Sequence, residues 1–188
     1  MRLSSFLFLF LTLYSNCIFV QTSTDYRIKV IHENYSVVRE NLASYTTDTV
    51  EVWDESSEGG EAIGYFHQAR VQMIEVVLFG ETRKYSSEYY FKNDSLYFVF
   101  TQDFIYNRPF YWDEKYAIES GDNEAYDPEK TITKENRYYF HNDRLFKWLD
   151  PEKRQIDLTS EENSKKGLDI IRRSLKIKDK FKNRDIHQ

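Results

Sequence analysis

The sequence predicts an α+β fold: a twisted antiparallel β-meander flanked by an N-terminal and a C-terminal helix. A phrase rich in aromatic residues occupies positions 89–97, returns at 138–146, and has a looser version at 65–71. Each phrase places apolar residues on both sides of a two-residue turn, a pattern typical of β-hairpins. Segments with helical periodicity stand before the first phrase and after the last.

Residues 1–22 predict a secretory signal peptide. Arg2 is the only charged residue before Asp25, and a short apolar run at positions 6–13 ends in a polar break. The run is shorter than the roughly 20 residues of a membrane-spanning helix, although an uncleaved N-terminal anchor is the alternative. Cys17 is the only cysteine of the chain. It is either the lipidated first residue of a bacterial lipoprotein or part of the removed peptide.

Residues 23–188 are expected to form a single α+β domain that is secreted, periplasmic or displayed at the cell surface. They contain no cysteine, which favours a bacterial envelope protein, because secreted eukaryotic domains often carry disulfides. The chain's formal net charge of −5 argues against nucleic acid as a partner. Membrane contact is expected only if Cys17 carries lipid or the signal peptide stays attached.

The first helix is expected over residues 24–43. Its apolar residues recur every three or four positions and therefore share one face: Ile28, Ile31, Tyr35, Val38 and Leu42. Thr24 or Asp25 can cap its first turn. Strands are expected at 46–53, 62–66, 70–79, 85–92 and 96–102, with a turn at 56–61.

The hairpin phrases predict which side chains share a face of the sheet. Asn93 and Asp94 suit a tight turn, because both residue types tolerate a positive φ. Pairing across this turn places Phe91 opposite Leu96 and Tyr89 opposite Phe98, and Phe140 opposite Leu145 in the second phrase, all toward the core. Phe66 is expected opposite Val71. The residues expected to point the other way are Tyr90, Tyr97, Tyr139 and Phe146.

A second helix is predicted from Thr159 to about Lys182. Thr159 and Glu162 fit a capping box. One apolar stripe consists of Leu168, Ile171 and Leu175, and another of Ile170, Ile177 and Phe181. The remaining residues are mostly basic, which suits the helix C-terminus and could also favour an anionic membrane or polymer.

The phrase Tyr-Tyr-Phe-x-Asn-Asp-x-Leu resembles MORN-type repeats, whose hairpins carry Tyr-Tyr/Phe-x-Asn-Gly-x-Leu. Asp94 and Asp143 stand where that pattern has glycine, and the unit expected near residue 115 is missing. The resemblance implies a twisted antiparallel sheet used as a binding or spacing surface, with no functional residue carried over. The layout also resembles uncharacterised secreted proteins of Bacteroidota-type bacteria, which implies export and no particular activity.

The segment from 103 to 130 interrupts the meander with an acidic, aromatic loop. Its candidate ligand-binding residues are Tyr106, Phe110, Tyr111, Trp112 and Tyr116. Surface tyrosine and tryptophan offer rigid contact area to an envelope protein or a glycan. The alternative is that the rings fold over one end of the sheet and close its core.

The chain offers little catalytic chemistry, and we expect no catalytic residue, metal or cofactor. Glycine-rich phosphate loops, paired metal-binding histidines and a nucleophilic serine elbow are missing.

His67 and His141 precede equivalent turns and would meet if the hairpins were adjacent. The loop's acids offer two weak alternatives, a Ca²⁺ cluster and a glycosidase-like pair of Asp113 and Glu119. The cluster would consist of Asp122, Glu124, Asp127 and Glu129.

The favoured function is therefore a non-enzymatic, exported binding or structural module. The first alternative is a small hydrolase that uses carboxylates of the same loop. The second is an inhibitor or accessory protein that inserts the aromatic loop at 104–126 into a partner's cleft.

Overall fold

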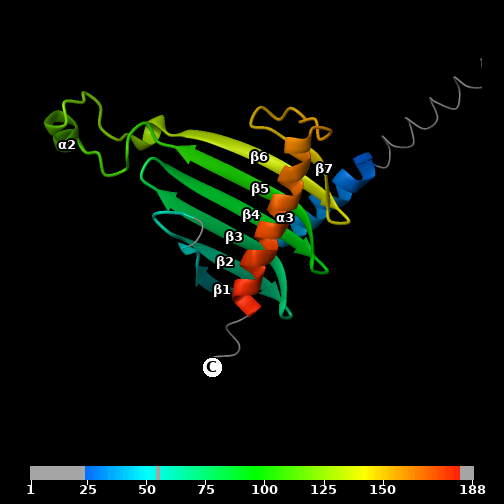
Figure 1. The fold of residues 1–188 in the computed structure, drawn as a ribbon. Helices are drawn as coiled ribbons and strands as arrows, with labels where there is room; N and C mark the ends of the chain where they lie inside the picture. The colour runs from blue at the N-terminus through cyan, green and yellow to red at the C-terminus, as the bar shows by residue number, and fades with distance from the viewer. Residues whose placement is uncertain (1–23, 54–55, 183–188) are drawn as a thin grey trace, which may run out of the picture.

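The computed structural model describes residues 24–53 and 56–182 of the 188-residue chain. A helix over residues 24–40 and a short 3₁₀ turn, η1 (Leu42–Ser44), precede the strands, and α3 (Glu161–Lys182) follows them. In the described residues, one antiparallel sheet holds its strands in chain order: β1 (Thr46–Glu51), β2 (Gly60–His67), β3 (Arg70–Gly80), β4 (Arg83–Lys92), β5 (Ser95–Ile105), β6 (Ile132–His141) and β7 (Arg144–Leu149). The predicted α+β meander with a helix at each end is confirmed (Figure 1).

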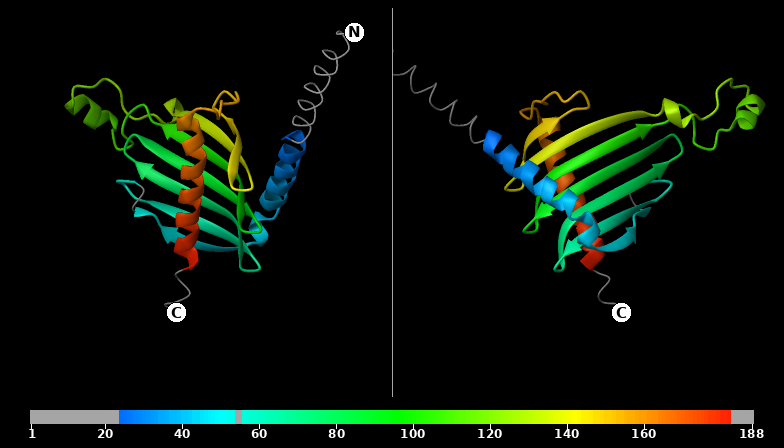
Figure 2. Two further views of the ribbon diagram at one scale, coloured as in Figure 1. Left: turned by 45° about the vertical axis from the view of Figure 1, so that its right-hand side comes forward. Right: turned by 180° about the vertical axis from the view of Figure 1, so that it is seen from behind.

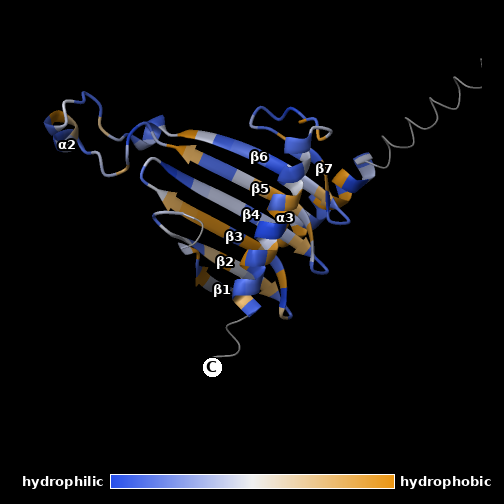
Figure 3. Ribbon diagram, viewed as in Figure 1, coloured by the Kyte–Doolittle hydropathy of each residue, from blue (hydrophilic) through white to orange (hydrophobic). Residues whose placement is uncertain are grey.

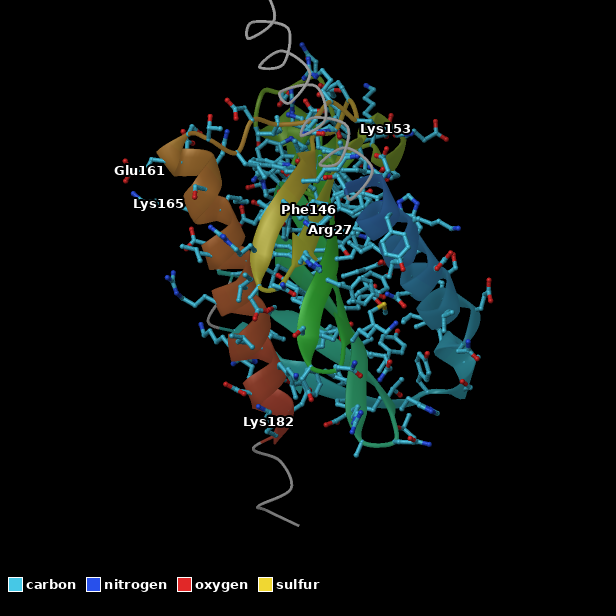
Figure 4. All side chains as sticks on the ribbon, turned by 90° about the vertical axis from the view of Figure 1, so that its right-hand side faces the viewer. Arg27, Phe146, Lys153, Glu161, Lys165 and Lys182 are labelled. Carbon is cyan, nitrogen blue, oxygen red and sulfur yellow. The ribbon has the colours of Figure 1, made fainter. Side chains whose placement is uncertain are left out.

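The two helices cover opposite faces of the sheet, so the molecule has three layers (Figure 2). A view from the side of the sheet places α3, with Lys165 and Lys182, on one side and the N-terminal helix on the other (Figure 4). Ile31 and Val38 of the N-terminal helix pack against one face, in the predicted stripe. Ile177 and Phe181 of α3 pack against the other.

The three hairpin phrases fold with two-residue turns. Both central residues have a positive φ in each turn: 50° and 61° at Gln68 and Ala69, 50° and 67° at Asn93 and Asp94, 49° and 54° at Asn142 and Asp143. Two positive φ values are the mark of the type I′ turn, whose twist matches that of the flanking strands. The predicted pairs next to the turns are confirmed: Phe66 with Val71, Phe91 with Leu96, and Phe140 with Leu145.

One pair further from the turn, the predicted register is wrong. Tyr90, and not Tyr89, lies opposite Phe98, because the register shifts between Tyr90 and Phe91 and leaves Tyr97 as an extra residue on β5. Such a β-bulge moves the strand beyond it by one position and exchanges its faces. Phe98 therefore packs with Tyr90 on the face of the N-terminal helix.

The expectation of a single core face is also wrong. Tyr90 and Phe91 are neighbours that point to opposite faces, and they are 0% and 1% exposed. Tyr97 and Tyr139, expected to point away from the core, are buried beneath the N-terminal helix. The reason is that each face has its own helix and therefore its own core.

The C-terminal helix begins at Glu161, two residues later than predicted, and its cap is Ser160 and not Thr159. The Ser160 hydroxyl accepts the Asn163 backbone N–H at 3.2 Å, whereas Thr159 donates its N–H and its hydroxyl to Asp157. Only one of the two apolar stripes is buried, because the helix presents one narrow face to the sheet. Leu168 and Leu175 of the other stripe are exposed.

The predicted signal peptide and Cys17 lie outside the described residues, so their roles stay predictions. In the part of the chain that the structure describes, no helix is long and apolar enough to span a membrane.

Substitutions in α3 test which stripe holds it to the sheet. Ile177→Ala leaves a cavity in a fully buried position and should lower the free energy of unfolding by about 2–5 kcal/mol. Leu175→Ala is the matched control on the exposed stripe and should cost about 1 kcal/mol or less. Urea denaturation followed by circular dichroism measures both, and equal losses would contradict the assignment of the buried face.

Candidate functional site

The segment between β5 and β6, residues 106–131, projects beyond the end of the sheet, and we call it the aromatic arm (Figure 1). It contains α2 (Glu114–Glu119) at its tip and the 3₁₀ turn η3 (Pro128–Lys130) where it returns to the sheet. Figure 3 shows apolar residues in α2, far from either helix-covered face. The arm is therefore a separate surface of the molecule.

Backbone hydrogen bonds fasten the base of the arm to the turn between β3 and β4. The Tyr106 N–H donates to the Thr82 carbonyl at 2.9 Å, and the Phe110 N–H donates to the Glu81 carbonyl, also at 2.9 Å. The Tyr111 hydroxyl donates to the Glu81 carboxylate at 3.2 Å. These contacts fix the direction in which the arm leaves the sheet.

Ion pairs then hold the two sides of the arm together. Arg108 donates to Asp122 through Nε at 2.7 Å and through Nη2 at 3.2 Å, and Nη2 lies 3.3 Å from Glu124. Lys130 donates to Glu124 at 2.8 Å. Asn107 joins the same network, donating to Glu124 at 3.1 Å and accepting the backbone N–H of Asp127 at 3.0 Å.

This network explains the electrostatics of the arm's acids. The hydrogen bonds from Arg108 lower the pKa of Asp122, and the hydrogen bond from Lys130, followed by that from Asn107, lowers the pKa of Glu124. Asp127 caps η3 by accepting the Glu129 N–H at 2.9 Å. The acids thus serve the arm's own structure, and in the described residues no group of three or more acidic, histidine or cysteine side chains is placed to hold a metal ion.

Four of the five predicted binding residues lie together. Trp112 and Tyr116 are 4.7 Å apart between ring centroids, and Tyr111 packs edge-on against Tyr116 at 6.1 Å and against Phe110 at 5.5 Å. Tyr106 stands apart at the base of the arm, against Tyr126 at 5.3 Å.

The alternative prediction, in which the rings of the arm fold over the end of the sheet and close its core, is wrong. Neither of the two hydrophobic cores includes them. Phe110, Tyr111 and Tyr116 keep 45–55% of their surface exposed, and Ile118 in α2 keeps 76%. The physical reason is that the arm extends past the sheet, so these rings pack against one another and not against either core.

The residues of two other chemical hypotheses, the Asp113–Glu119 pair and the two histidines, lie apart in the structure. Asp113 caps α2 by accepting the Tyr116 N–H at 2.7 Å, while Glu119 lies at the opposite end of that helix, 3.9 Å from Lys115. His67 and His141 end strands that are separated by three others, which places them about 19 Å apart at 4.8 Å per strand. The hairpins are therefore not adjacent, and the two histidines do not meet.

Sequence reasoning missed two residues of the arm and its surroundings. Among the described residues, Ile118 is the most exposed large apolar side chain. The available signal was Asp113, a residue type that often caps a helix, just before the helix that carries Ile118. Arg108, the basic centre of the ion-pair network, was not predicted to have a role. Its role depends on the chain doubling back by fourteen residues to Asp122, which composition does not reveal.

Comparison with protein families, with curated proteins and with solved structures finds no match to this chain. Function is therefore argued from the geometry of the site.

We expect Arg108→Gln to loosen the arm without unfolding the sheet, because its guanidinium contacts both Asp122 and Glu124 and lies outside both cores. Hydrogen exchange measured by mass spectrometry should speed up within residues 107–127, while the urea midpoint stays unchanged. Lys115→Gln is the matched control, since its 3.9 Å pair in α2 is exposed and weak. Faster exchange in the strands of the Arg108 variant would contradict a local role.

The arm should also loosen in acid. Because the pKa values of Asp122 and Glu124 are lowered in the folded protein, their contribution is complete above the ordinary carboxyl pKa of about 4 and is lost as the pH falls through the lower folded values. The indole N–H resonance of Trp112 should broaden or shift below about pH 4. The indole of Trp148, which donates to Asn136 at 2.9 Å within the sheet, is the internal control, and simultaneous changes in both would contradict the prediction.

Proposed function

We propose that this protein is a non-enzymatic, exported binding module of the bacterial cell envelope and that the aromatic arm is its contact surface for a protein partner. The single observation that carries the proposal is the exposed cluster of rings on an ordered, projecting arm. Export itself rests on the sequence of residues 1–22.

The exposed rings suit a protein interface. Phe110, Tyr111 and Tyr116 combine apolar area with few rotatable bonds, and aromatic side chains of this kind dominate the binding energy of many interfaces. Ile118, two residues after Tyr116 in α2, adds a second exposed apolar side chain at the tip of the arm. Monomeric proteins rarely leave such apolar residues grouped at the surface without an interaction to serve.

Pre-organisation supports the same function. The hydrogen bonds that Tyr106 and Phe110 donate to the β3–β4 turn and the ion pairs of Arg108 hold the arm in place before any partner arrives. An ordered loop loses less conformational entropy on binding than a mobile one does. The projecting shape favours insertion into a concave partner, as in the accessory or inhibitor role.

Site-specific photo-crosslinking tests the proposal. Benzoylphenylalanine placed at Ile118 should give a crosslinked protein of defined mass in envelope fractions of the producing bacterium. The same group at Tyr26, an exposed residue of the N-terminal helix, is the matched control and should give none.

Tyr111→Ala combined with Tyr116→Ala should abolish the crosslink while the circular dichroism spectrum stays unchanged. Equal crosslinking from Ile118 and Tyr26, or a crosslink that survives the double substitution, would refute the arm as the interface.

A further inference from the structure

A second candidate site, independent of the arm, lies where the N-terminal helix meets β5 and β6. A cavity of about 190 Å³ opens there between helix and sheet. The helix contributes His32 and Tyr35, and the strands contribute Phe98, Phe100, Arg137 and Tyr139. We call it the helix-margin groove.

The register of the strands explains the groove. Phe98 pairs with Tyr139, and Phe100 pairs with Arg137, so these residues form two successive rows on one face of the sheet. The N-terminal helix covers the first row: Tyr35 packs edge-on against Phe98 at 5.7 Å, and His32 lies 6.2 Å from Tyr139. The second row lies at the margin of the helix and forms the far wall of the groove.

Arg137 is held in this wall with part of its hydrogen-bonding capacity unused. Its Nη2 donates to Glu135 at 2.7 Å, and its guanidinium lies over the Phe100 ring at 5.0 Å. Gln102 donates to the same Glu135 at 3.2 Å and fixes that carboxylate. The Arg137 Nη1 is buried without an acceptor in the described structure, so the guanidinium keeps an unsatisfied donor. The side chain as a whole is 24% exposed and lines the groove.

The charges that face the groove favour an anion. Arg137 and Lys147, whose ammonium lies 5.7 Å from the Tyr139 ring, are positive. Glu135 is the opposing acid and is already engaged by Arg137 and Gln102. Glu88, on the next strand, is paired with Arg39 at 3.4 Å and bonded to the Tyr90 hydroxyl.

We propose that the helix-margin groove binds a small aromatic carboxylate, whose ring lies between Tyr35 and Phe100 and whose carboxylate pairs with the Arg137 guanidinium. The ring-lined walls select a flat apolar body, and a guanidinium matches a carboxylate by geometry as well as charge. The cavity is smaller than the roughly 300–1,000 Å³ of sites for drug-sized ligands, which limits the ligand to a single ring. The carboxylate can belong to a free acid or to a C-terminal aromatic residue of a peptide.

Two-dimensional NMR titrations of the full chain test this site with phenylacetate as the probe and phenylacetamide as its neutral counterpart. Phenylacetate should shift backbone resonances of His32, Phe100 and Arg137 and bind at least about tenfold more tightly than the amide, because only the acid forms a charge-assisted hydrogen bond. N-acetylphenylalanine is the third probe. If N-acetylphenylalanine binds more tightly than phenylacetate, the natural carboxylate belongs to a peptide C-terminus. If it binds more weakly, the natural ligand is a free acid.

Variants separate charge from packing. Arg137→Gln should weaken phenylacetate about tenfold and leave phenylacetamide unchanged, whereas Phe100→Ala should weaken both. Arg83→Gln is the matched control, because Arg83 pairs with Asp103 at another position and lines no part of this groove. If Arg137→Gln does not fold, Arg137→Lys keeps the charge without the planar fork and should still weaken phenylacetate. Equal affinity for the acid and the amide, or shifts that map away from the groove, would overturn the proposal.

Discussion

The structure depends on one constraint, the burial of both faces of a single antiparallel sheet. Successive residues of a strand point to opposite faces, so Tyr90 and Phe91 enter two different cores although they are adjacent in sequence. Each face therefore requires its own cover. The N-terminal helix and α3 supply the two covers, one from before the strands and one from after them, so each core is complete only when its helix has packed.

At the β4–β5 turn, a contact with α3 offsets the conformational cost of a positive φ at a residue other than glycine. Asp94 adopts a φ of 67°, a conformation that favours glycine. Its carboxylate accepts a hydrogen bond of 2.6 Å from Lys178 of α3, and this contact lowers the pKa of Asp94. The same ammonium lies 5.2 Å from the Phe91 ring. An aspartate in place of glycine thus ties the β4–β5 turn to the helix, a link that glycine could not make.

The first helix and the hairpin turns were predictable from the sequence, because each depends on residues that are close together in the chain. The spacing from Ile28 to Leu42 predicts the first helix, and the Asn-Asp pairs predict turns at Asn93 and Asn142. The bulge at Tyr97 was not predictable in the same way, because it depends on how two strands share a twist. The cluster of Phe110, Tyr111, Trp112 and Tyr116 was predictable as a group of rings. Its position outside both cores depends on the tertiary path of the arm.

The helices cover the turn end of the sheet more completely than the opposite end, and this difference places both proposed sites. Along β6, Tyr138, Tyr139 and Phe140 are buried near the turn, whereas Ile132 at the other end is exposed. Beyond the edge of the helices, the side chains of the strands do not have to pack into a core. The helix-margin groove lies along that boundary, and the aromatic arm begins where β5 passes beyond it (Figure 2). Strands that extend past the helices crossing them thus keep a stable core and leave strand ends on which binding surfaces can be built (Figure 1).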